Sequence, residues 1–477
     1  SSIGKFGGDT DNWIWPRHTG DFSMFRVYAS KDNRPAAYSP QNVPYRPKKH
    51  FSISTKGVKE GDFTMIYGFP GNTQEYILSD AVAYIAERSD PAKIAVRTGR
   101  LDIITKAQES DPALRIHYAA KHASIANAWK KWQGEALGID RRGTVAAKFD
   151  YETQFGLWSV GRPEYAGVVM GLRAEYDRIM DAYFAYEITR ETLSTLPAAY
   201  TPEERSEECF ARRKFAEQAL WRHAFREYGR CPKVYRTPSY AEGMARYKSP
   251  EAYADALFEA VWEGSDSVAM QPAVRLREET KRMLDHISWM LGTKSLRNLN
   301  SKILNELYTT YIKGLREWDR ERAFYPDANL TLRVAYGSVA GYEYADGEYH
   351  KPQTTLDGII AKDNPEIYDY DIPQSLRDLY ASKNYGRWGT VIDGRRTVPV
   401  CFLATNHTTG GNSGSPVLNA GGELIGINFD RTWRSTMSDI AFDPAICRNI
   451  AVDIRYVLFV VDRVGGAGYL LKEMTLK

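Results

Sequence analysis

The spacing of apolar residues changes twice along this chain of 477 residues. Up to about residue 86, short apolar runs alternate with turn residues such as Gly68-Phe-Pro-Gly71, a pattern typical of β-strands. From about residue 88 to 323 the apolar residues recur at helical intervals. Beyond Pro326 the β pattern returns. The sequence therefore predicts a β unit over 1–87, a large helical domain over 88–323 and a second β unit over 324–477.

Residue ranges can be predicted for the strands and helices with the clearest patterns. In the first β unit we expect strands at 22–28, 51–54, 63–67 and 76–84. In the helical domain we expect helices at 174–195, 202–228, 250–263 and 274–322, the second of them introduced by the N-cap Thr201. The second β unit should contain strands at 330–336, 397–404, 416–418 and 424–429, a short helix at 373–382 and an amphipathic ending over 450–474. The stretch 342–349 fits either a loop or a hairpin.

The composition of the chain bears on which binding partners can be expected. Apolar residues make up 43% of the chain, and 63 basic residues nearly balance 60 acidic ones, for a net charge of +3. This balance gives no reason to expect nucleic acid or a membrane surface. No apolar run approaches the ~18 residues that span a bilayer, and the first residues lack a signal-peptide pattern. The cysteines lack metal-site spacing, so we expect no metal or cofactor and leave their disulfide state open: Cys209, Cys231, Cys401 and Cys447.

The segment 409–417, Thr-Gly-Gly-Asn-Ser-Gly-Ser-Pro-Val, has the pattern of a serine nucleophile turn before a strand. Small neighbours would leave the hydroxyl of Ser413 exposed, and the N–H groups of Gly411 and Ser413 can converge on one point. Such an oxyanion hole stabilises developing negative charge by roughly 3–4 kcal/mol per donor. The alternative is an ordinary Gly/Ser-rich surface loop. Because an apolar strand pattern follows at 423–429, we favour the nucleophile interpretation.

A serine nucleophile needs a base and a carboxylate that orients it. Asp21 precedes a predicted strand and is the candidate carboxylate, although it could equally be a turn residue. None of the eight histidines has a persuasive pattern. His18 is three residues from Asp21, and His407 lies on the same loop as Ser413, so neither is well placed as the base.

Four segments together resemble the S46 family of bacterial dipeptidyl peptidases: 12–22, 124–131, 324–327 and 410–416. The resemblance implies a chymotrypsin-like double β-barrel, with the first barrel incomplete here and a helical domain inserted between the catalytic Asp21 and Ser413. In the family the triad histidine precedes the Asn12-Trp13 motif, so we expect it to be missing from this chain. The chain alone should then be nearly inactive, since losing such a base costs on the order of 10⁶ in turnover. A homodimer, a periplasmic location and the missing N-terminal segment as a partner are also implied.

The resemblance assigns the substrate's free α-ammonium to Asn12, Trp13, Asn127 and Asp430. A carboxylate and an amide oxygen suit an ammonium group. Taken from the residues alone, Asn127 reads as a polar helix residue and Trp13 as a core residue. The implied substrates are oligopeptides with a free N-terminus.

Arg431, 18 positions beyond Ser413, is the expected selector of the P1 residue. Family members that prefer an acidic P1 have Arg there, and those that prefer a hydrophobic P1 have Gly. A guanidinium would pair with Asp or Glu at P1 and disfavour an apolar side chain; the alternative is a solvated surface arginine like Arg434. We therefore expect a serine exopeptidase that releases N-terminal dipeptides after Asp or Glu. The remaining alternatives are a hydrophobic P1 preference and a non-catalytic peptide-binding module.

Overall fold

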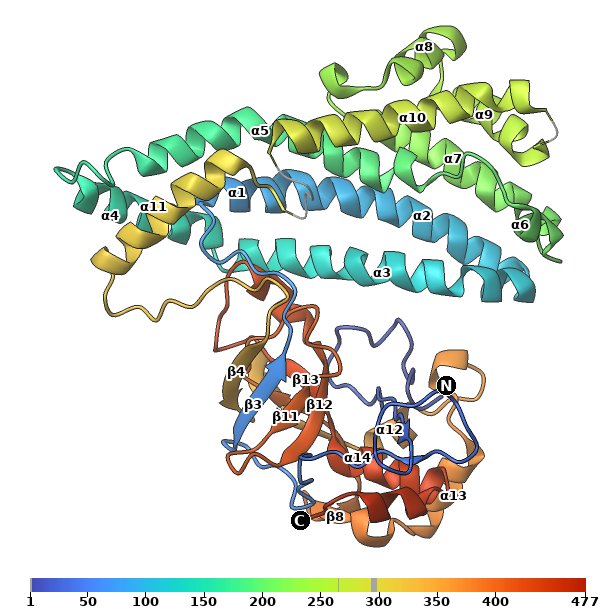
Figure 1. The fold of residues 1–477 in the computed structure, drawn as a ribbon, viewed down its shortest axis with the longest axis vertical. Helices are drawn as coiled ribbons and strands as arrows, with labels where there is room; N and C mark the ends of the chain where they lie inside the picture. Colours follow the sequence, from blue (N-terminus) through green and yellow to red (C-terminus); the bar gives the residue numbers. More distant parts are fainter. Residues whose placement is uncertain (1, 265, 293–297) are drawn as a thin grey trace. The chain divides into compact units, whose positions relative to one another are not determined.

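The computed structural model describes residues 2–264, 266–292 and 298–477, which form two compact units. The first unit contains the residues up to Glu75 together with Asp327–Lys477, and the second is Tyr76–Pro326 (Figure 1). A helical insertion between two β-containing segments is the arrangement that the sequence predicted. The limits lie at 75/76 and 326/327, where the sequence placed them at 87/88 and 323/324.

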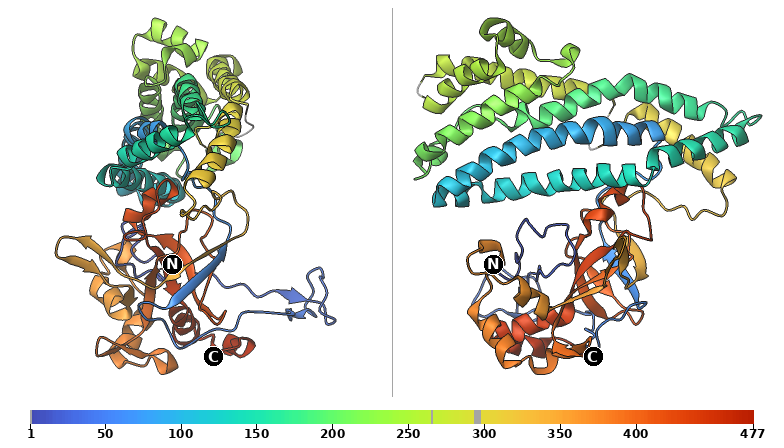
Figure 2. Two further views of the ribbon diagram at one scale, coloured as in Figure 1. Left: turned by 90° about the vertical axis from the view of Figure 1, so that its left-hand side faces the viewer. Right: turned by 180° about the vertical axis from the view of Figure 1, so that it is seen from behind.

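The second unit is helical. Helices α2 and α3 lie side by side in Figures 1 and 2, and Asp111 caps α3 by accepting a hydrogen bond from the N–H of Ala113 at 2.7 Å. A core rich in Tyr, Phe and Trp fills the space between the helices. The longer helices are α2 (Asp90–Ser110), α3 (Pro112–Arg141), α4 (Thr144–Ser159), α5 (Val168–Glu191), α7 (Lys214–Tyr228), α8 (Pro238–Tyr247), α9 (Pro250–Glu263), α10 (Ser267–Met290) and α11 (Lys302–Trp318).

Three predictions in this region differ from the structure. The helix predicted over 202–228 is interrupted, so that α6 (Pro202–Ser206) is separate from α7. The helix predicted over 274–322 is two helices, α10 and α11, and residues 293–297 between them lie outside the described chain. The strand predicted over 76–84 instead contains α1 (Ser79–Ala83); Ala81 and Val82 of this helix are buried, as is its N-cap residue Leu78. Their i, i+3, i+4 spacing is helical, so the prediction of a strand here is wrong.

The first unit is built on a seven-stranded antiparallel sheet in the order β4-β3-β11-β12-β13-β10-β7. A bridge between Val339 and Ala404 joins the end of β4 to the end of β10, which curls the sheet back on itself. The predicted nucleophile turn, residues 409–417, follows β10 and leads into β11. The strands are β3 (Phe63–Gly68), β4 (Arg333–Ser338), β7 (Gln353–Thr355), β10 (Pro399–Ala404), β11 (Pro416–Leu418), β12 (Leu424–Arg431) and β13 (Asn449–Asp453).

Strand β3 lies between β4 and β11, so the β segments before and after the helical insertion share one sheet. Of the strand predicted over 22–28, only the end is regular: β1 (Tyr28–Ala29) pairs with β2 (Val43–Pro44). Figure 2 shows this ribbon extending away from the sheet. Phe25 is 89% exposed, and the backbone pairing of this ribbon ends at Val27, whose carbonyl oxygen accepts a hydrogen bond from the N–H of Tyr45 at 2.9 Å. A separate first barrel over 1–87 stays a prediction.

The rest of the first unit packs against the sheet. The predicted short helix is α13 (Gln374–Ser382), and the amphipathic ending contains β13 and α14 (Ile454–Phe459). The remaining elements are α12 (Leu356–Lys362) and two hairpins, β5 (Tyr342–Ala345) with β6 (Glu348–His350), and β8 (Thr390–Ile392) with β9 (Arg395–Thr397). All four cysteines are buried free thiols. None of the helices in the described chain combines the length and the apolarity that a bilayer crossing requires.

Candidate active site

The turn that carries Ser413 is held by the side chain of Asn412. The Asn412 amide oxygen accepts a hydrogen bond from the N–H of Thr409 at 3.0 Å, and its main-chain oxygen accepts from the N–H of Ser415 at 3.0 Å. Asn412 is 2% exposed, whereas Ser413 is exposed. Gly411 has φ 105°, where a side chain would be strained, and a Cβ there would collide with the carbonyl oxygen of Phe69. Glycine at 411 is therefore a steric requirement of the turn.

The main-chain N–H groups of this turn divide into two sets. Those of Asn412, Gly414 and Ser415 donate to carbonyl oxygens within the chain. Those of Gly411 and Ser413 donate to no group in the part of the chain that the structure describes. These are the two N–H groups that we predicted from the sequence to form an oxyanion hole. The turn thus leaves the pair available to an incoming oxygen atom.

The hydroxyl of Ser413 donates a hydrogen bond to the carbonyl oxygen of Phe429, at 3.1 Å. Among the described residues, no histidine hydrogen-bonds to this hydroxyl. His407 turns its Nε2 to the carbonyl of Ser438 (2.9 Å) and its Nδ1 to Glu75 (3.2 Å). Burial lowers the pKa of His407, although the charge of Asp439 opposes the shift. His407 is therefore committed to a structural network beside the turn.

His18 is buried against α12. Its imidazole packs on Gly358, where no side chain would fit, and its Nδ1 has no hydrogen-bond partner in the described chain. Burial, with a smaller effect of the Lys362 charge, lowers the pKa of His18 to about 3. Enclosed against α12 and with its affinity for a proton lowered, His18 is poorly suited to serve Ser413 as a base. Neither His18 nor His407 was predicted to be the base for Ser413. Their contacts in the structure explain why neither is suited to that role.

Asp430 lies on β12, one residue beyond the carbonyl that receives the Ser413 hydroxyl. Its Oδ2 accepts hydrogen bonds from the N–H of Trp13 (3.1 Å) and from Nη1 of Arg17 (2.7 Å). Its Oδ1 accepts from the N–H of Arg431 at 2.8 Å. Trp13 has φ 67°, an uncommon backbone conformation for a residue with a side chain, and it directs its N–H to this carboxylate. The structure therefore brings Trp13 and Asp430 together, 417 positions apart in sequence.

Arg17 is the residue here that the sequence did not single out. Its guanidinium is buried, bonds to the carbonyl of Asp11 as well as to Asp430, and lies 5.2 Å from the ring centre of Phe429. It offsets the charge of Asp430 and fixes the loop that carries Trp13. Arg17 stands in the Trp-Pro-Arg-His-Thr-Gly-Asp motif, yet its partner lies 413 positions away, so local pattern could not reveal the pair.

Arg431 points its guanidinium at Asp439. Nη1 and Nη2 donate to the two carboxylate oxygens at 2.6 and 2.8 Å, and Nη1 also bonds to the carbonyl of Thr408 at 3.0 Å. Arg431 is 4% exposed, unlike a solvated surface arginine. The guanidinium also lies 5.5 Å from the ring centre of Trp13. Asp439 is a second residue that the sequence did not identify.

The remaining predicted residues are less tightly defined. Asp21 is exposed; partial desolvation raises its pKa, opposed by the charge of Arg17 and reinforced by that of Asp430, so it shares their electrostatic environment. Asn12 is half-buried next to Trp13. Asn127 is exposed on α3, in the helical unit, and is described there only.

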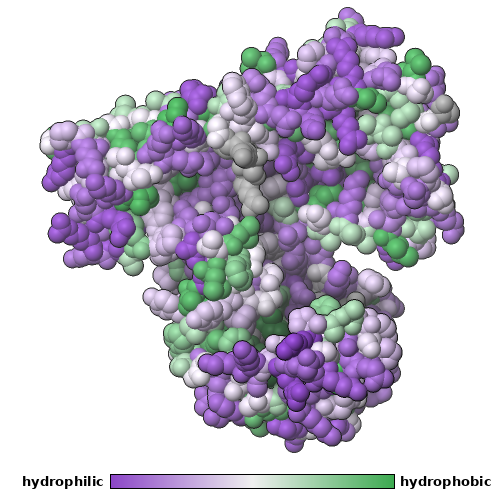
Figure 3. Space-filling model, viewed as in Figure 1, coloured by the Kyte–Doolittle hydropathy of each residue, from purple (hydrophilic) through white to green (hydrophobic). Residues whose placement is uncertain are grey.

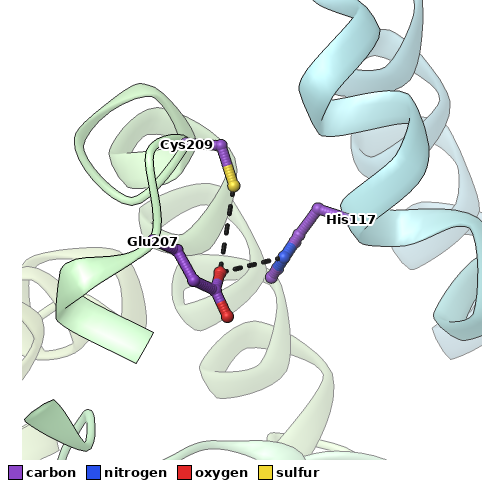
Figure 4. Close-up of side chains that lie close together, drawn as sticks. All are labelled: His117, Glu207 and Cys209. Carbon is purple, nitrogen blue, oxygen red and sulfur yellow. Dashed lines mark hydrogen bonds and ion pairs between the residues drawn. The ribbon is translucent and has the colours of Figure 1, made fainter. Parts of the chain in front are cut away.

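The helical unit also contains His117, Glu207 and Cys209 with their ligand atoms close together (Figure 4). Nδ1 of His117 lies 3.3 Å from Glu207, but Nη1 of the buried Arg213 lies 2.7 Å from Nε2 of His117 and 3.3 Å from Glu207. The guanidinium charge would repel a metal cation at this position. This cluster is best described as a hydrogen-bonded ion pair.

Comparison with known proteins is informative over the whole chain. The peptidase S46 family model matches residues 1–208 and 204–476. An Asp/Glu-specific dipeptidyl-peptidase from Capnocytophaga gingivalis is 41% identical over 522 residues, covering all of this chain and 72% of the relative. One of the same description from Flavobacterium psychrophilum is 42% identical over 516 residues, covering all of this chain and 71% of the relative.

A solved structure shows the same fold. The crystal structure of Porphyromonas endodontalis DPP11 in complex with the dipeptide Arg-Glu matches with a TM-score of 0.84 at 34% sequence identity. The match covers all of this chain and 73% of that chain.

Proposed function

Since this chain belongs to the peptidase S46 family, we propose that it carries the nucleophile and the substrate-recognition residues of a serine exopeptidase that releases N-terminal dipeptides after Asp or Glu. One observation carries the proposal: three consecutive residues of β12 serve three tasks. Phe429 accepts the hydroxyl of Ser413, Asp430 presents a carboxylate, and Arg431 presents a guanidinium. The relatives named Asp/Glu-specific dipeptidyl-peptidases support it.

The amine end of the substrate would be read by Asp430. A carboxylate has about four acceptor positions, and three are used by Trp13, Arg17 and the N–H of Arg431. A substrate ammonium can take the remaining one through a charge-assisted hydrogen bond. Asn12 and, from the helical unit, Asn127 are proposed to add amide oxygens. A peptide with a blocked N-terminus would leave Asp430 without this partner.

The P1 side chain would be read by Arg431. Its guanidinium is already bidentate with Asp439, so its planar group is fixed before substrate arrives. A P1 carboxylate would share this preorganised cation. An apolar P1 side chain would gain no charge-assisted hydrogen bond from this cation.

Chemistry at Ser413 requires a proton acceptor. During attack, the carbonyl oxygen of the substrate would enter the space between the N–H groups of Gly411 and Ser413. Asp21 is proposed as the carboxylate that orients the base, and the base itself as the histidine that the family places before Asn12. We expect the 477-residue chain alone to turn over peptides very slowly, and we expect the periplasmic location and homodimer typical of the family.

Labelling by a fluorophosphonate tests the nucleophile, because only an activated serine reacts. We expect Ser413 to be labelled when the family's N-terminal segment is supplied, and Ser413→Ala to abolish labelling. Ser415→Ala, which changes a buried hydroxyl two residues away, is the matched control and should be labelled normally. An unlabelled Ser413 in the complete protein would instead favour a non-catalytic peptide-binding module.

Substitution of Arg431 tests the P1 assignment. We expect Arg431→Gly to lower kcat/KM for peptides with Asp or Glu at P1 by about 100-fold, since a buried charge pair is worth roughly 2–5 kcal/mol. Cleavage after hydrophobic residues should rise in the same variant. Undiminished cleavage after Asp and Glu would show that Arg431 is not the selector.

A further inference from the structure

The two residues that hold Arg431 are themselves held through their main chain. Arg431 donates hydrogen bonds to the Ser438 hydroxyl at 2.9 Å and to the Asp439 carboxylate at 2.6 and 2.8 Å. The main-chain oxygens of the same two residues contact other parts of the chain. Nε2 of His407 lies 2.9 Å from the carbonyl oxygen of Ser438, and the N–H of Gln74 donates to that of Asp439 at 2.6 Å. We call these two contacts the main-chain supports.

His407 provides the first support. A carbonyl oxygen only accepts hydrogen bonds, so Nε2 of His407 must carry the hydrogen that it donates to Ser438. The imidazole is stacked on Phe442 with the ring centres 4.5 Å apart, and its Nδ1 lies 3.2 Å from Glu75. These contacts fix the direction in which the Nε2–H group points. His407 therefore serves as an oriented donor to the main chain of Ser438.

Asp327 organises the second support. Its Oδ1 accepts hydrogen bonds from the hydroxyl of Thr73 at 2.6 Å and from the N–H of Glu75 at 3.0 Å. One carboxylate oxygen thus holds the residues on both sides of Gln74, whose own N–H reaches Asp439. The direction of the Gln74 N–H group therefore depends on a carboxylate far away in sequence.

Both supports are formed by buried polar groups. Hydrophilic residues cover most of the surface in the view of Figure 3, where water can replace a lost hydrogen bond. By contrast, Thr73 and Glu75 are only 7% and 9% exposed, and Ser438 is 2% exposed. A buried group that loses its partner is left unsatisfied, which costs more than the loss of an exposed hydrogen bond. We therefore expect the chain to shift when either support is removed.

The two supports also share one electrostatic environment. Burial lowers the pKa of His407, and the charge of Asp439 opposes this shift; Arg431 lowers the pKa further, and Asp327 raises it. His407 and Asp327 therefore act on the same pair of charges from different segments. Asp327 ends the segment 324–327, one of the four that resemble the S46 family, and the proposed reaction assigns it no role.

We propose that His407 and Asp327 are positioning residues for P1 recognition. They hold the main chain of residues 438–439, and through it the guanidinium of Arg431, where an acidic P1 side chain can meet it. This inference rests on the proposed exopeptidase function, in which Arg431 reads P1. The physical basis is preorganisation, because a group that is fixed before the substrate arrives loses less conformational freedom on binding. A Leu side chain at P1 makes no use of the guanidinium and should not sense its displacement.

The test uses an enzyme preparation that releases dipeptides, and two peptides that differ only in Asp or Leu at P1. The readout is the ratio of kcat/KM for the Asp peptide to that for the Leu peptide, which cancels any general loss of active enzyme. We expect His407→Phe, which keeps an aromatic ring but removes the donor to Ser438, to lower this ratio about 10-fold. Asp327→Ala should lower it to a similar extent. The fall should come from a higher KM for the Asp peptide, with kcat changed by less than about twofold.

Conservative variants separate positioning from bulk. His407→Gln keeps a donor and Asp327→Asn keeps an acceptor, so each should restore most of the ratio. Thr73→Val is a mild, isosteric variant that removes one hydrogen bond to Asp327, and it should lower the ratio about threefold. His350→Phe is the matched control and should leave the ratio unchanged. His350 also lies beside a glutamate and stacks on an aromatic ring, but its hydrogen bonds go to Tyr342 and Glu348.

An unchanged ratio in His407→Phe and Thr73→Val, with a lower Tm, would overturn the proposal, because these residues would then stabilise the fold alone. Equal losses of kcat/KM for the Asp and Leu peptides would overturn it as well. Because Thr73→Val is isosteric, it decides the question for Asp327 even when Asp327→Ala does not fold. A natural enzyme that cleaves equally well after Asp and after Leu would show the P1 assignment to be wrong, and this inference with it. Failure of the inference alone is seen only in the variants.

Discussion

Asp430 and Arg431 are neighbours on β12 with opposite charges, and their partners hold them differently. Asp430 meets a single nitrogen of Arg17 and two main-chain N–H groups. Arg431 meets both oxygens of Asp439 and further oxygens at Thr408 and Ser438. The carboxylate of Asp430 thus keeps acceptor capacity, whereas the guanidinium of Arg431 is fixed by paired hydrogen bonds to one carboxylate. We infer that Asp430 contributes binding energy directly, while Arg431 depends on Asp439 for its position.

The largest effect is expected for Asp430→Asn. The substrate ammonium would lose its carboxylate, and the buried Arg17 would be left as an uncompensated cation that repels it. We expect kcat/KM for peptides with a free N-terminus to fall at least 100-fold, or about 3 kcal/mol. Steady-state kinetics with free and N-acetylated peptides would measure this. An equal loss for both substrates would contradict the role of Asp430 as amine anchor.

Asp439→Asn tests the other half of the comparison. Removing one charge of a buried pair should lower the free energy of unfolding by about 3 kcal/mol. A product dipeptide ending in Asp should restore part of this loss, since its carboxylate replaces the missing charge beside Arg431. Thermal unfolding with Asp-ending and Leu-ending dipeptides is the measurement. Equal shifts of Tm for the two dipeptides would argue against an acidic P1 site.

A third prediction concerns acid. The folded-state pKa of His18 is about 3, below the ordinary value of 6.5, so the unfolded chain binds a proton first as the pH falls. The contribution of neutral His18 is complete above about pH 6.5 and is lost as the pH falls toward 3. At pH 5 the loss should be about 2 kcal/mol. Because His18 adjoins Arg17, this acid sensitivity bears on the Asp430 side of the site.

Urea unfolding at pH 7 and pH 5 would measure the change, with His18→Gln expected to be less sensitive to acid than the natural chain. The exposed His50→Gln offers a control substitution in the same unit. Identical acid dependence in the natural chain and His18→Gln would contradict the assignment.

The smallest effect is expected for Arg434→Gln. Arg434 stacks on Tyr344 with its guanidinium 4.3 Å from the ring centre, and such a contact contributes about 0.5–1 kcal/mol. We expect the preference between Asp and Leu at P1 to change less than twofold. A larger change would mean that the selecting charge is shared by two arginines instead of belonging to Arg431.

The sequence was most informative where local signals agreed. The helix Pro250–Glu263 has the predicted limits, because Ser249 caps it and Pro250 occupies its first turn. Strands β11 and β12 begin at the predicted residues. The prediction of a helical part and a β-sheet is confirmed, while the roles of individual site residues stay predictions.

The sequence was least informative where distant contacts decide the outcome. The start of α1 is set by Tyr308 and Glu152, whose side-chain oxygens accept hydrogen bonds from the N–H groups of Leu78 and Ser79. Arg17 pairs with Asp430 across 413 positions. Asp439 follows Arg431 by eight positions, but only the 3₁₀ turn of Trp433–Asp439 brings its carboxylate back to the guanidinium. Contacts of this kind cannot be predicted from the spacing of residues along the chain.

The adjacency of Asp430 and Arg431 on β12 has a consequence for how the substrate preference of this protein can evolve. Because the proposed amine anchor, Asp430, and the proposed P1 selector, Arg431, are consecutive residues of one strand, we expect a single codon change at 431 to alter the preferred side chain. The length of the product cannot be altered in that way, since an insertion that moved Asp430 would also shift Arg431 and the carbonyl beneath Ser413. The preference for the P1 side chain should therefore diverge readily among descendants of this sequence, whereas the release of dipeptides should persist.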